Sequence, residues 1–541
     1  MKNLKFIPLI LLALFSYSAW AQPFNEYLKK PKLVVAIVID QFRADYLTKY
    51  QSRFQPAKSA KGVGGFNFLF SQGAWIPQAH YTHLQNMTGP GHSTILSGAN
   101  TYLTGIPVNE WYDTTKKKPV YCVSDDDHVW LSGSVIDRTG TSPKNFFGST
   151  VGDELKNFNK NAKVVSLSLK DRAAILMGGK RSDVTIWMDP SKLIWTSSTY
   201  YYPEKKLPSF VLEANSQLEK LRKNSLSDSP YFKNLQWEKS VKWNQFPEKL
   251  TWGDKNFPKG PAGLAILEAL AETAVTEMKL GKGNQTDLLS VSFSAHDYAG
   301  HMHGAESPQM EEMTIADDIV LAKLFNFLAK AVPGGLENVA IVLTADHGVA
   351  PNPEISKKNK VDSGRASEDT MKKNIETALI EKFGKQDEPY LLQFKDMNLF
   401  LNHKLITEEK IGIEKVENEV VRVLEKEESI LRAFSYHQFL EGKLPPGIFK
   451  KQILNTYFPG RSGDVIGILK PFYVSDTDTA VHQTGYSYDS NVPILFYGRG
   501  VKSGVYPLNA EVIDIAPTLS YLTGVLPPAL SEGRVLSEIL K

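Results

Sequence analysis

Five apolar segments restrict the fold of this chain more than any other feature. They lie at residues 33–39, 164–169, 288–293, 339–344 and 492–497. Each is short and mostly apolar at successive positions, which is the pattern of a strand buried on both faces. Stretches with helical periodicity, such as residues 263–278 and 310–331, separate most of them. The alternation predicts an α/β fold with a mainly parallel central sheet flanked by helices.

Two regions interrupt this alternation, and we interpret both as insertions into one large domain over residues 22–541. Residues 195–260 are rich in aromatic, lysine and turn-forming residues, which predicts an inserted cap over the functional site. Residues 377–474 combine strand-like and helical patterns, which predicts a small α/β subdomain.

The first 21 residues, 1–21, have the layout of a cleavable secretory signal peptide. Lys2 and Lys5 precede an apolar run at residues 6–15, and Ala19-Trp20-Ala21 follows it. The run is shorter than the ~20 residues that a spanning helix needs, which disfavours a permanent membrane anchor. We therefore expect a periplasmic or secreted protein with no stable membrane insertion after signal removal.

The net charge narrows the range of expected partners, and the cysteine content excludes one kind of cross-link. The formal net charge is +3, and removal of Lys2 and Lys5 leaves +1. So small a charge gives no electrostatic bias toward nucleic acid or anionic membranes, and we expect small-molecule partners and no nucleic acid. Cys122 is the only cysteine, which excludes an internal disulfide. The oligomeric state is left open, and a monomer is compatible with these features.

The run Thr88-Gly-Pro-Gly-His precedes a short apolar segment, and it predicts a sharp turn that leads into a helix. Thr88 would then lie at the helix N-terminus, where backbone N–H groups favour an anion. Thr88 is our candidate nucleophile. A free threonine hydroxyl is too weakly acidic to attack at neutral pH, so this hypothesis requires an activating base or metal nearby.

Acidic and imidazole side chains follow several predicted strands, at the edge where ligands bind in open α/β sheets. They are Asp40, Asp297, His301, Asp346, His347 and His482, the last in a loop before the fifth segment. His296 and His303 are alternatives, and each residue taken singly also fits a helix cap or a hydrogen-bonded surface group. Nitrogen and carboxylate ligands without thiolates suit zinc. Two such ions about 4 Å apart would suit phosphoryl transfer.

Three further side chains could bind a phosphoryl group. Lys170 and Arg172 follow the segment at residues 164–169, and Asn109 follows the Thr88 region. Arginine pairs bidentately with phosphoryl oxygens and lysine binds them as a point charge. The alternative is an ordinary surface pair of cations with Asp171 between them.

Taken together, the order and spacing of these motifs resemble the alkaline phosphatase superfamily over nearly the whole mature chain. More closely, the chain resembles the phosphate-irrepressible periplasmic alkaline phosphatases of bacteria, which use a threonine nucleophile. The resemblance implies two Zn²⁺ ions per chain. It assigns one ion to Asp297, His301 and His482, and the other to Asp40, Asp346 and His347 with the Thr88 oxygen. It also assigns phosphate binding to Asn109, Lys170 and Arg172.

The implied activity is hydrolysis of small-molecule phosphate monoesters through a covalent phosphothreonine. One alternative is a phosphodiesterase or nucleotide pyrophosphatase with the same metals, although that branch lacks the pair formed by Lys170 and Arg172. An alternative of another class is a catalytically degenerate metal- or phosphate-binding protein, although every expected position is filled. A third, magnesium site of the enterobacterial enzyme has no clear ligand set in this sequence.

Overall fold

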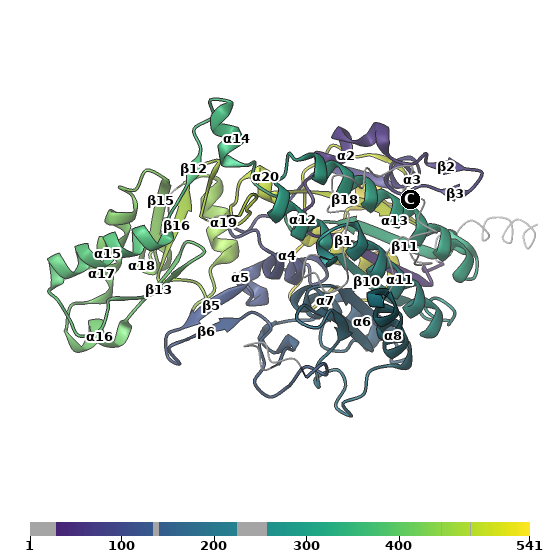
Figure 1. Cartoon of the computed structure of the whole chain (residues 1–541), viewed down its shortest axis with the longest axis horizontal. Coiled ribbons are helices and arrows are strands. Elements are labelled where there is room, and N and C mark those ends of the chain that lie inside the picture. The colour runs from purple at the N-terminus through teal and green to yellow at the C-terminus, as the bar shows by residue number, and fades with distance from the viewer. Residues whose placement is uncertain (1–28, 134–139, 224–256, 445, 476–477) are drawn as a thin grey trace, which may run out of the picture.

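The computed structural model describes residues 29–133, 140–223, 257–444, 446–475 and 478–541 (Figure 1). The expected signal peptide at residues 1–21 lies outside these ranges. Among the described residues, no helix has the length and apolar character to cross a membrane.

A ten-stranded sheet forms the centre of the molecule, in the order β19-β4-β18-β11-β1-β10-β7-β8-β9 with β20 beside β4. Its strands are β1 Leu33–Ile39, β4 Ala74–His80, β7 Val164–Ser168, β8 Val184–Asp189, β9 Ile194–Thr196, β10 Asp287–Phe293, β11 Val339–Thr344, β18 Asn491–Tyr497, β19 Gly504–Val505 and β20 Ala510–Glu511. All five predicted segments are strands of this sheet. Every residue of β1, β10 and β11 is buried, as their apolar runs predict.

The sheet is mainly parallel, as predicted. β1 pairs in parallel with β10 and β11, and β7 pairs in parallel with β10 and β8. β18 is antiparallel to both of its neighbours, β11 and β4. The carboxyl ends of β7, β10, β1 and β11 therefore meet at one edge, and their amino ends meet at the opposite edge.

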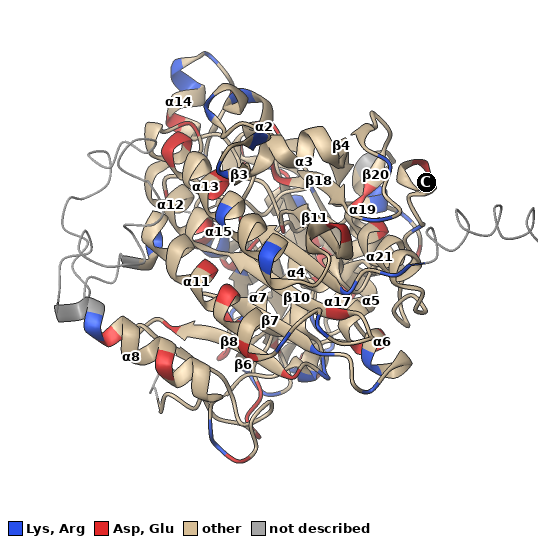
Figure 2. Cartoon of the chain, turned by 90° about the vertical axis from the view of Figure 1, so that its right-hand side faces the viewer, with Lys and Arg blue, Asp and Glu red and all other residues tan. Residues whose placement is uncertain are grey.

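Two groups of helices enclose the sheet (Figure 2). The first group comprises α3 Phe66–Gln72, α8 Ser209–Lys223, α11 Pro261–Glu277, α12 Ala295–His303 and α13 Pro308–Ala331. The second comprises α4 Thr88–Ile95, α5 Thr101–Thr104, α6 Val151–Phe158, α7 Asp171–Gly178 and α21 Ile515–Thr523. The apolar sides of both groups join the strands in one large core. The fold is therefore the expected α/β architecture with helices flanking the sheet.

A separate lobe is inserted between β11 and β18, on the left of Figure 1. A four-stranded antiparallel sheet, ordered β13-β14-β16-β15, carries its own hydrophobic core. The elements are α15 Glu368–Phe383, β13 Leu391–Lys395, β14 Asn398–Leu401, α16 His403–Glu408, α17 Ile413–Leu424, β15 Ile430–Ser435, α19 Ile448–Thr456 and β16 Val465–Leu469. The lobe starts with α15, before residue 377, because that helix packs on β13 and α17. A separate core is what an inserted subdomain requires.

The expected cap at residues 195–260 is described only in part. Its first portion forms the end of β9 and helix α8, which packs against β9 and α11. Residues 224–256 lie outside the described ranges. The cap therefore stays a prediction.

Candidate metal centre

Three buried carboxylates come together at the carboxyl edge of the sheet. Asp40 follows β1, Asp297 lies in α12 after β10, and Asp346 follows β11, and none is more than 2% exposed. These strands are neighbours and run in parallel, so the residues that follow them converge. The structure therefore brings together the three acids that the sequence analysis groups, and their role as metal ligands stays a prediction.

The histidines complete two groups of candidate ligands. The ligand atoms of Asp297, His347 and His482 lie within 4.8 Å of one another, and so do those of Asp40, Asp346 and His347. His301 Nε2 lies 3.2 Å from Asp297 Oδ1, at the side of the first group. All six expected ligands are therefore adjacent. His347 lies between the two groups, with its ring stacked on that of His482 at a centroid distance of 3.6 Å.

The orientation of the imidazoles suits metal binding. Nδ1 of His301 lies 2.8 Å from the Ala480 carbonyl oxygen, and Nδ1 of His482 lies 2.9 Å from that of Asn86. Donation from Nδ1 to a carbonyl fixes the tautomer in which Nε2 carries a lone pair. Nε2 of each ring points toward Asp297 Oδ1.

Several buried polar atoms of the site make no hydrogen bond. They are Asp40 Oδ1, Asp346 Oδ2 and His347 Nε2. A buried polar atom without a hydrogen bond is costly, and such atoms are rare in folded proteins. A bound cation would satisfy all three atoms, so the residues present fit a metal ion.

Thr88 is the first residue of α4 and is almost fully buried. Its Oγ1 accepts hydrogen bonds from Lys170 Nζ at 3.3 Å and from Arg172 Nη2 at 3.2 Å. Lys170 Nζ also lies 2.7 Å from Asp40 Oδ2 and 2.6 Å from Asp297 Oδ2. The candidate nucleophile thus lies beside two cations, and one of these contacts both ligand groups.

Asn109 and Arg172 are held in place by neighbouring groups. The backbone N–H of Gly89 donates to Asn109 Oδ1 at 2.7 Å, which leaves the Asn109 amide nitrogen as a donor. Arg172 Nη1 donates to the Tyr121 hydroxyl at 3.4 Å, and that hydroxyl donates to Asp171 Oδ1 at 2.6 Å. The interpretation of Lys170 and Arg172 as an exposed surface pair is therefore wrong, because both side chains lie inside the site.

The charges of the site are coupled through Lys170. Burial disfavours the Lys170 ammonium, but Asp297 and Asp40 raise its pKa above the ordinary lysine value. Burial also opposes ionisation of Asp297, yet Lys170 and His301 hold the pKa of that carboxyl well below its usual range. Burial lowers the pKa of His482, so its imidazole is neutral. The ionised Asp297 and the neutral His482 are in the forms that bind a metal. Although burial opposes protonation, the neighbouring carboxylates raise the pKa of His301, and they raise that of His347 to about 9, so a bound metal would have to displace a proton from each of these two rings.

The sequence analysis missed Gln41 and His92. The Gln41 backbone N–H donates to Asp346 Oδ1 at 3.1 Å, and its side-chain amide donates to Asp297 Oδ1 at 2.8 Å. A left-handed backbone conformation, with φ 66°, allows both bonds. His92 Nδ1 lies 3.2 Å from Asp346 Oδ2 and 2.8 Å from the Thr88 carbonyl oxygen. The sequence contains only one indication for each residue: Gln41 directly follows Asp40, and His92 lies within the Thr88-Gly-Pro-Gly-His run.

The alternative ligands His296 and His303 are outside both groups. His296 is buried, and its Nδ1 pairs with Asp317 Oδ2 at 2.7 Å. Its ring lies against Phe42 with a centroid distance of 5.1 Å. His303 is the last residue of α12, two positions after His301. His296 is therefore a hydrogen-bonded structural histidine, and it lies in the core and not at the surface.

Comparison with known proteins gives matches over nearly the whole chain. The Type I phosphodiesterase / nucleotide pyrophosphatase family model matches residues 34–486. Alkaline phosphatase PafA of Elizabethkingia meningoseptica is 33% identical, over 94% of this chain and 95% of that protein. Alkaline phosphatase PhoV of Synechococcus elongatus is 32% identical, over 100% of both proteins.

Solved structures agree with these matches. The crystal structure of wild-type PafA covers 95% of this chain and 100% of its own, with a TM-score of 0.84 and 31% identity. A PafA variant with the same coverage and TM-score has 30% identity, and it carries a threonine-to-serine change and alanine at one asparagine, one lysine and one arginine. The expected superfamily and fold are confirmed. The chain belongs to the Type I phosphodiesterase / nucleotide pyrophosphatase family of the alkaline phosphatase superfamily, and it is an alkaline phosphatase enzyme.

Proposed function

We propose that this enzyme hydrolyses phosphate monoesters with two zinc ions and a covalent phosphothreonine at Thr88. The observation that carries the proposal is the position of Thr88 Oγ1, within hydrogen-bonding distance of both Lys170 and Arg172 and beside both ligand groups. A nucleophile, a pair of cations and a metal centre are the parts that phosphoryl transfer requires. The expected signal peptide supports action in the periplasm or outside the cell.

The residues divide between two ions. Asp297, His301 and His482 would hold one ion, and Asp40, Asp346 and His347 the other, with the Thr88 oxygen as a further ligand. The all-nitrogen-and-oxygen donor set favours zinc. When bound, the ions supply a lowered pKa for the Thr88 hydroxyl and positive charge near the attacking and leaving oxygens.

The remaining residues handle the phosphoryl group. Thr88 Oγ1 forms a bond to phosphorus while the bond to the ester oxygen breaks, and the alcohol leaves with a proton. Water then attacks the phosphothreonine from the opposite side, which releases phosphate and restores Thr88. Lys170, Arg172 and the Asn109 amide donate to the non-bridging oxygens in both steps.

The PafA variant supports this assignment. Its substituted threonine and asparagine are separated along the chain by the same number of positions as Thr88 and Asn109, and its lysine and arginine by the same number as Lys170 and Arg172. The four residue types also occur in the same order. We therefore assign to this chain the same set of four residues around the phosphoryl group.

The second candidate is a phosphodiesterase, because the family description names that activity too. A monoester dianion carries one more free oxygen and one more negative charge than a diester. The buried Lys170 and the partly buried Arg172 are matched to that additional charge. They favour the monoesterase over the diesterase, and the complete set of ligands and nucleophile disfavours a degenerate binding protein.

Hydrolysis of a paired aryl phosphate monoester and methyl aryl phosphate diester tests the proposal. The zinc-loaded enzyme should show a much higher kcat/KM for the monoester. Arg172→Ala should lower the monoester kcat/KM by about 100-fold or more and the diester value far less, because the lost contact is to the additional oxygen. A preference for the diester that Arg172→Ala leaves unchanged would establish the phosphodiesterase instead.

A further inference from the structure

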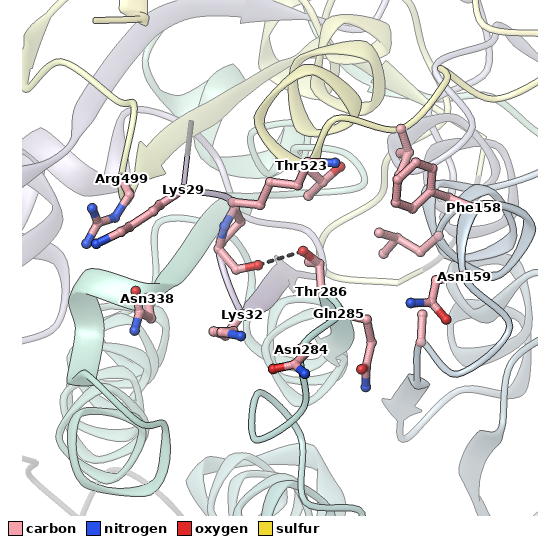
Figure 3. A pocket seen from close by; sticks show the side chains of 15 residues that line it. Lys29, Lys32, Phe158, Asn159, Asn284, Gln285, Thr286, Asn338, Arg499 and Thr523 are labelled. Atoms are coloured by element: carbon pink, nitrogen blue, oxygen red, sulfur yellow. Dashed lines mark hydrogen bonds between the residues drawn. The ribbon is translucent and has the colours of Figure 1, made fainter. Parts of the chain in front are cut away.

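A cavity opens at the amino edge of the sheet, opposite the edge at which the metal centre lies. Figure 3 shows the side chains that line it. The cavity measures about 580 Å³, and three of its lining residues directly precede strands: Lys32 before β1, Thr286 before β10 and Asn338 before β11. Arg499 reaches the same edge because β18 runs antiparallel to β11. The seven residues of β1 separate the two edges by about 23 Å, so the cavity is distinct from the catalytic site.

The cavity is strongly basic. Lys29, Lys30, Lys32 and Arg499 line it, and its described lining includes no aspartate or glutamate. Lys30 Nζ donates to the Gly524 carbonyl at 3.3 Å and Lys32 Nζ to the Gly283 carbonyl at 2.9 Å. These two lysines therefore have a structural role at chain turns.

Lys29 and Arg499 have no such role. Neither side chain forms an ion pair with any residue that the structure describes. The Arg499 Nε is buried and makes no hydrogen bond. Figure 3 shows both side chains extending to the same side of the cavity. Two cations brought together repel each other unless an anion lies between them, so their placement fits an anionic ligand.

The other side of the cavity is apolar and aromatic. Phe158, at the end of α6, is 66% exposed, and the Lys30 ammonium lies 4.5 Å from its ring centroid. Asn159 and Gln285 add amide groups beside it. An exposed ring beside amide donors and acceptors can bind a flat organic group by stacking and hydrogen bonding.

We propose that this cavity is a second, non-catalytic binding site for a phosphate-bearing organic anion. The phosphate would lie against Lys29 and Arg499, and the organic part would lie against Phe158. A volume of about 580 Å³ is in the range of sites for ligands of nucleotide size. The same chemistry occurs in soluble nucleotides and in the headgroups of anionic lipids.

Binding measurements on the zinc-loaded full-length enzyme test the proposal. The probes are α,β-methylene-ADP, followed by equilibrium dialysis, and phosphatidylglycerol vesicles, followed by co-sedimentation. The test variant is Lys29→Ala/Arg499→Ala. The control is Lys373→Ala/Lys385→Ala, which removes the same charge from exposed lysines of the inserted lobe. The kcat/KM for an aryl phosphate should stay within about twofold in both variants, because neither changes the metal centre.

Wild type and control should bind two molecules of the nucleotide analogue per chain, one at each site. The test variant should bind one, with affinity for the other weakened by about tenfold or more. Loss of vesicle binding alone would assign the site to lipid headgroups and still support the proposal. Unchanged binding of both probes by a test variant with normal kcat/KM would overturn it.

Discussion

A single glycine sets how closely the Thr88 helix approaches the metal centre. A Cβ built on Gly91 would lie 2.1 Å from the carbonyl oxygen of Asp346. No side chain fits there, so Gly91→Ala must move either α4 or Asp346. We expect a loss of about 1–3 kcal/mol of unfolding free energy and of about tenfold or more in kcat/KM.

A matched glycine provides the control for that prediction. A Cβ on Gly467, in β16, would meet its nearest neighbour at 3.5 Å, which is ordinary contact. Gly467→Ala should therefore leave kcat/KM unchanged. Thermal denaturation and steady-state kinetics of both variants measure the difference, and equal effects of the two substitutions would contradict the packing argument.

Asp318 gives stability a dependence on pH that is separate from catalysis. Burial raises its pKa to about 7, although its carboxylate accepts hydrogen bonds from the Gln55 and Phe66 backbone N–H groups. The folded state therefore binds a proton more tightly than the unfolded state, where the pKa is 3.8. This contribution to stability is present below pH 4 and is lost as the pH rises through 7.

Replacement of Asp318 by asparagine should remove that component. We expect the unfolding free energy of Asp318→Asn to fall less than that of wild type between pH 5 and pH 8. Chemical denaturation at the two pH values checks this prediction. Gly467→Ala is the reference, because its unfolding free energy should depend on pH as that of wild type does. An identical pH dependence in Asp318→Asn and wild type would show that Asp318 does not titrate in this range.

At the scale of elements, Arg461 connects the inserted lobe to the loop that carries Asn109. Arg461 Nη1 donates to the Gly105 carbonyl at 2.5 Å and to the Asn145 carbonyl at 2.7 Å. Its guanidinium lies within 4.9 Å of the rings of Trp111, Phe147 and Phe458. One side chain thus fixes the segment between α5 and Asn109.

Arg461→Leu should loosen that segment and displace Asn109. We expect kcat/KM for a monoester to fall by about tenfold and the unfolding free energy by about 1–3 kcal/mol. The added substitution Asn109→Ala should lower kcat/KM further by much less than it does in wild type, because both changes act through one contact. Fully additive effects in this double-mutant cycle would contradict the connection.

The sequence predicted the buried strands better than it predicted the direction of β18 or the backbone conformation of single residues such as Gln41. Continuous apolar runs identified β1, β10 and β11, and the parallel arrangement then placed Asp40 and Asp346 together. The antiparallel direction of β18 was not predictable, because the inserted lobe separates β18 from β11 along the chain and no short crossover connection fixes how the two strands pair. The left-handed conformation of Gln41 was likewise hidden, since glutamine rarely adopts it and long-range bonds to Asp297 and Asp346 stabilise it.

At the scale of the whole molecule, the metal centre joins segments that are far apart in the chain. Its ligands follow β1, β10 and β11 and precede β18, so bound metal would cross-link the core of the sheet. Chelation should abolish activity and lower Tm by about 5 °C or more, and zinc should restore both. The chelated protein should stay folded, because Lys170 pairs with Asp40 and Asp297. Full activity and an unchanged Tm after complete metal removal would exclude a metal enzyme.

The most direct test of the proposed reaction is to trap its covalent intermediate. Enzyme mixed with a ³²P-labelled aryl phosphate and quenched in acid within milliseconds should carry label on the peptide that contains Thr88. Thr88→Ala should carry none and should lose about 1,000-fold or more in kcat, whereas Thr88→Ser should still be labelled. Label on a different residue, or near-normal turnover by a folded Thr88→Ala variant, would contradict the account.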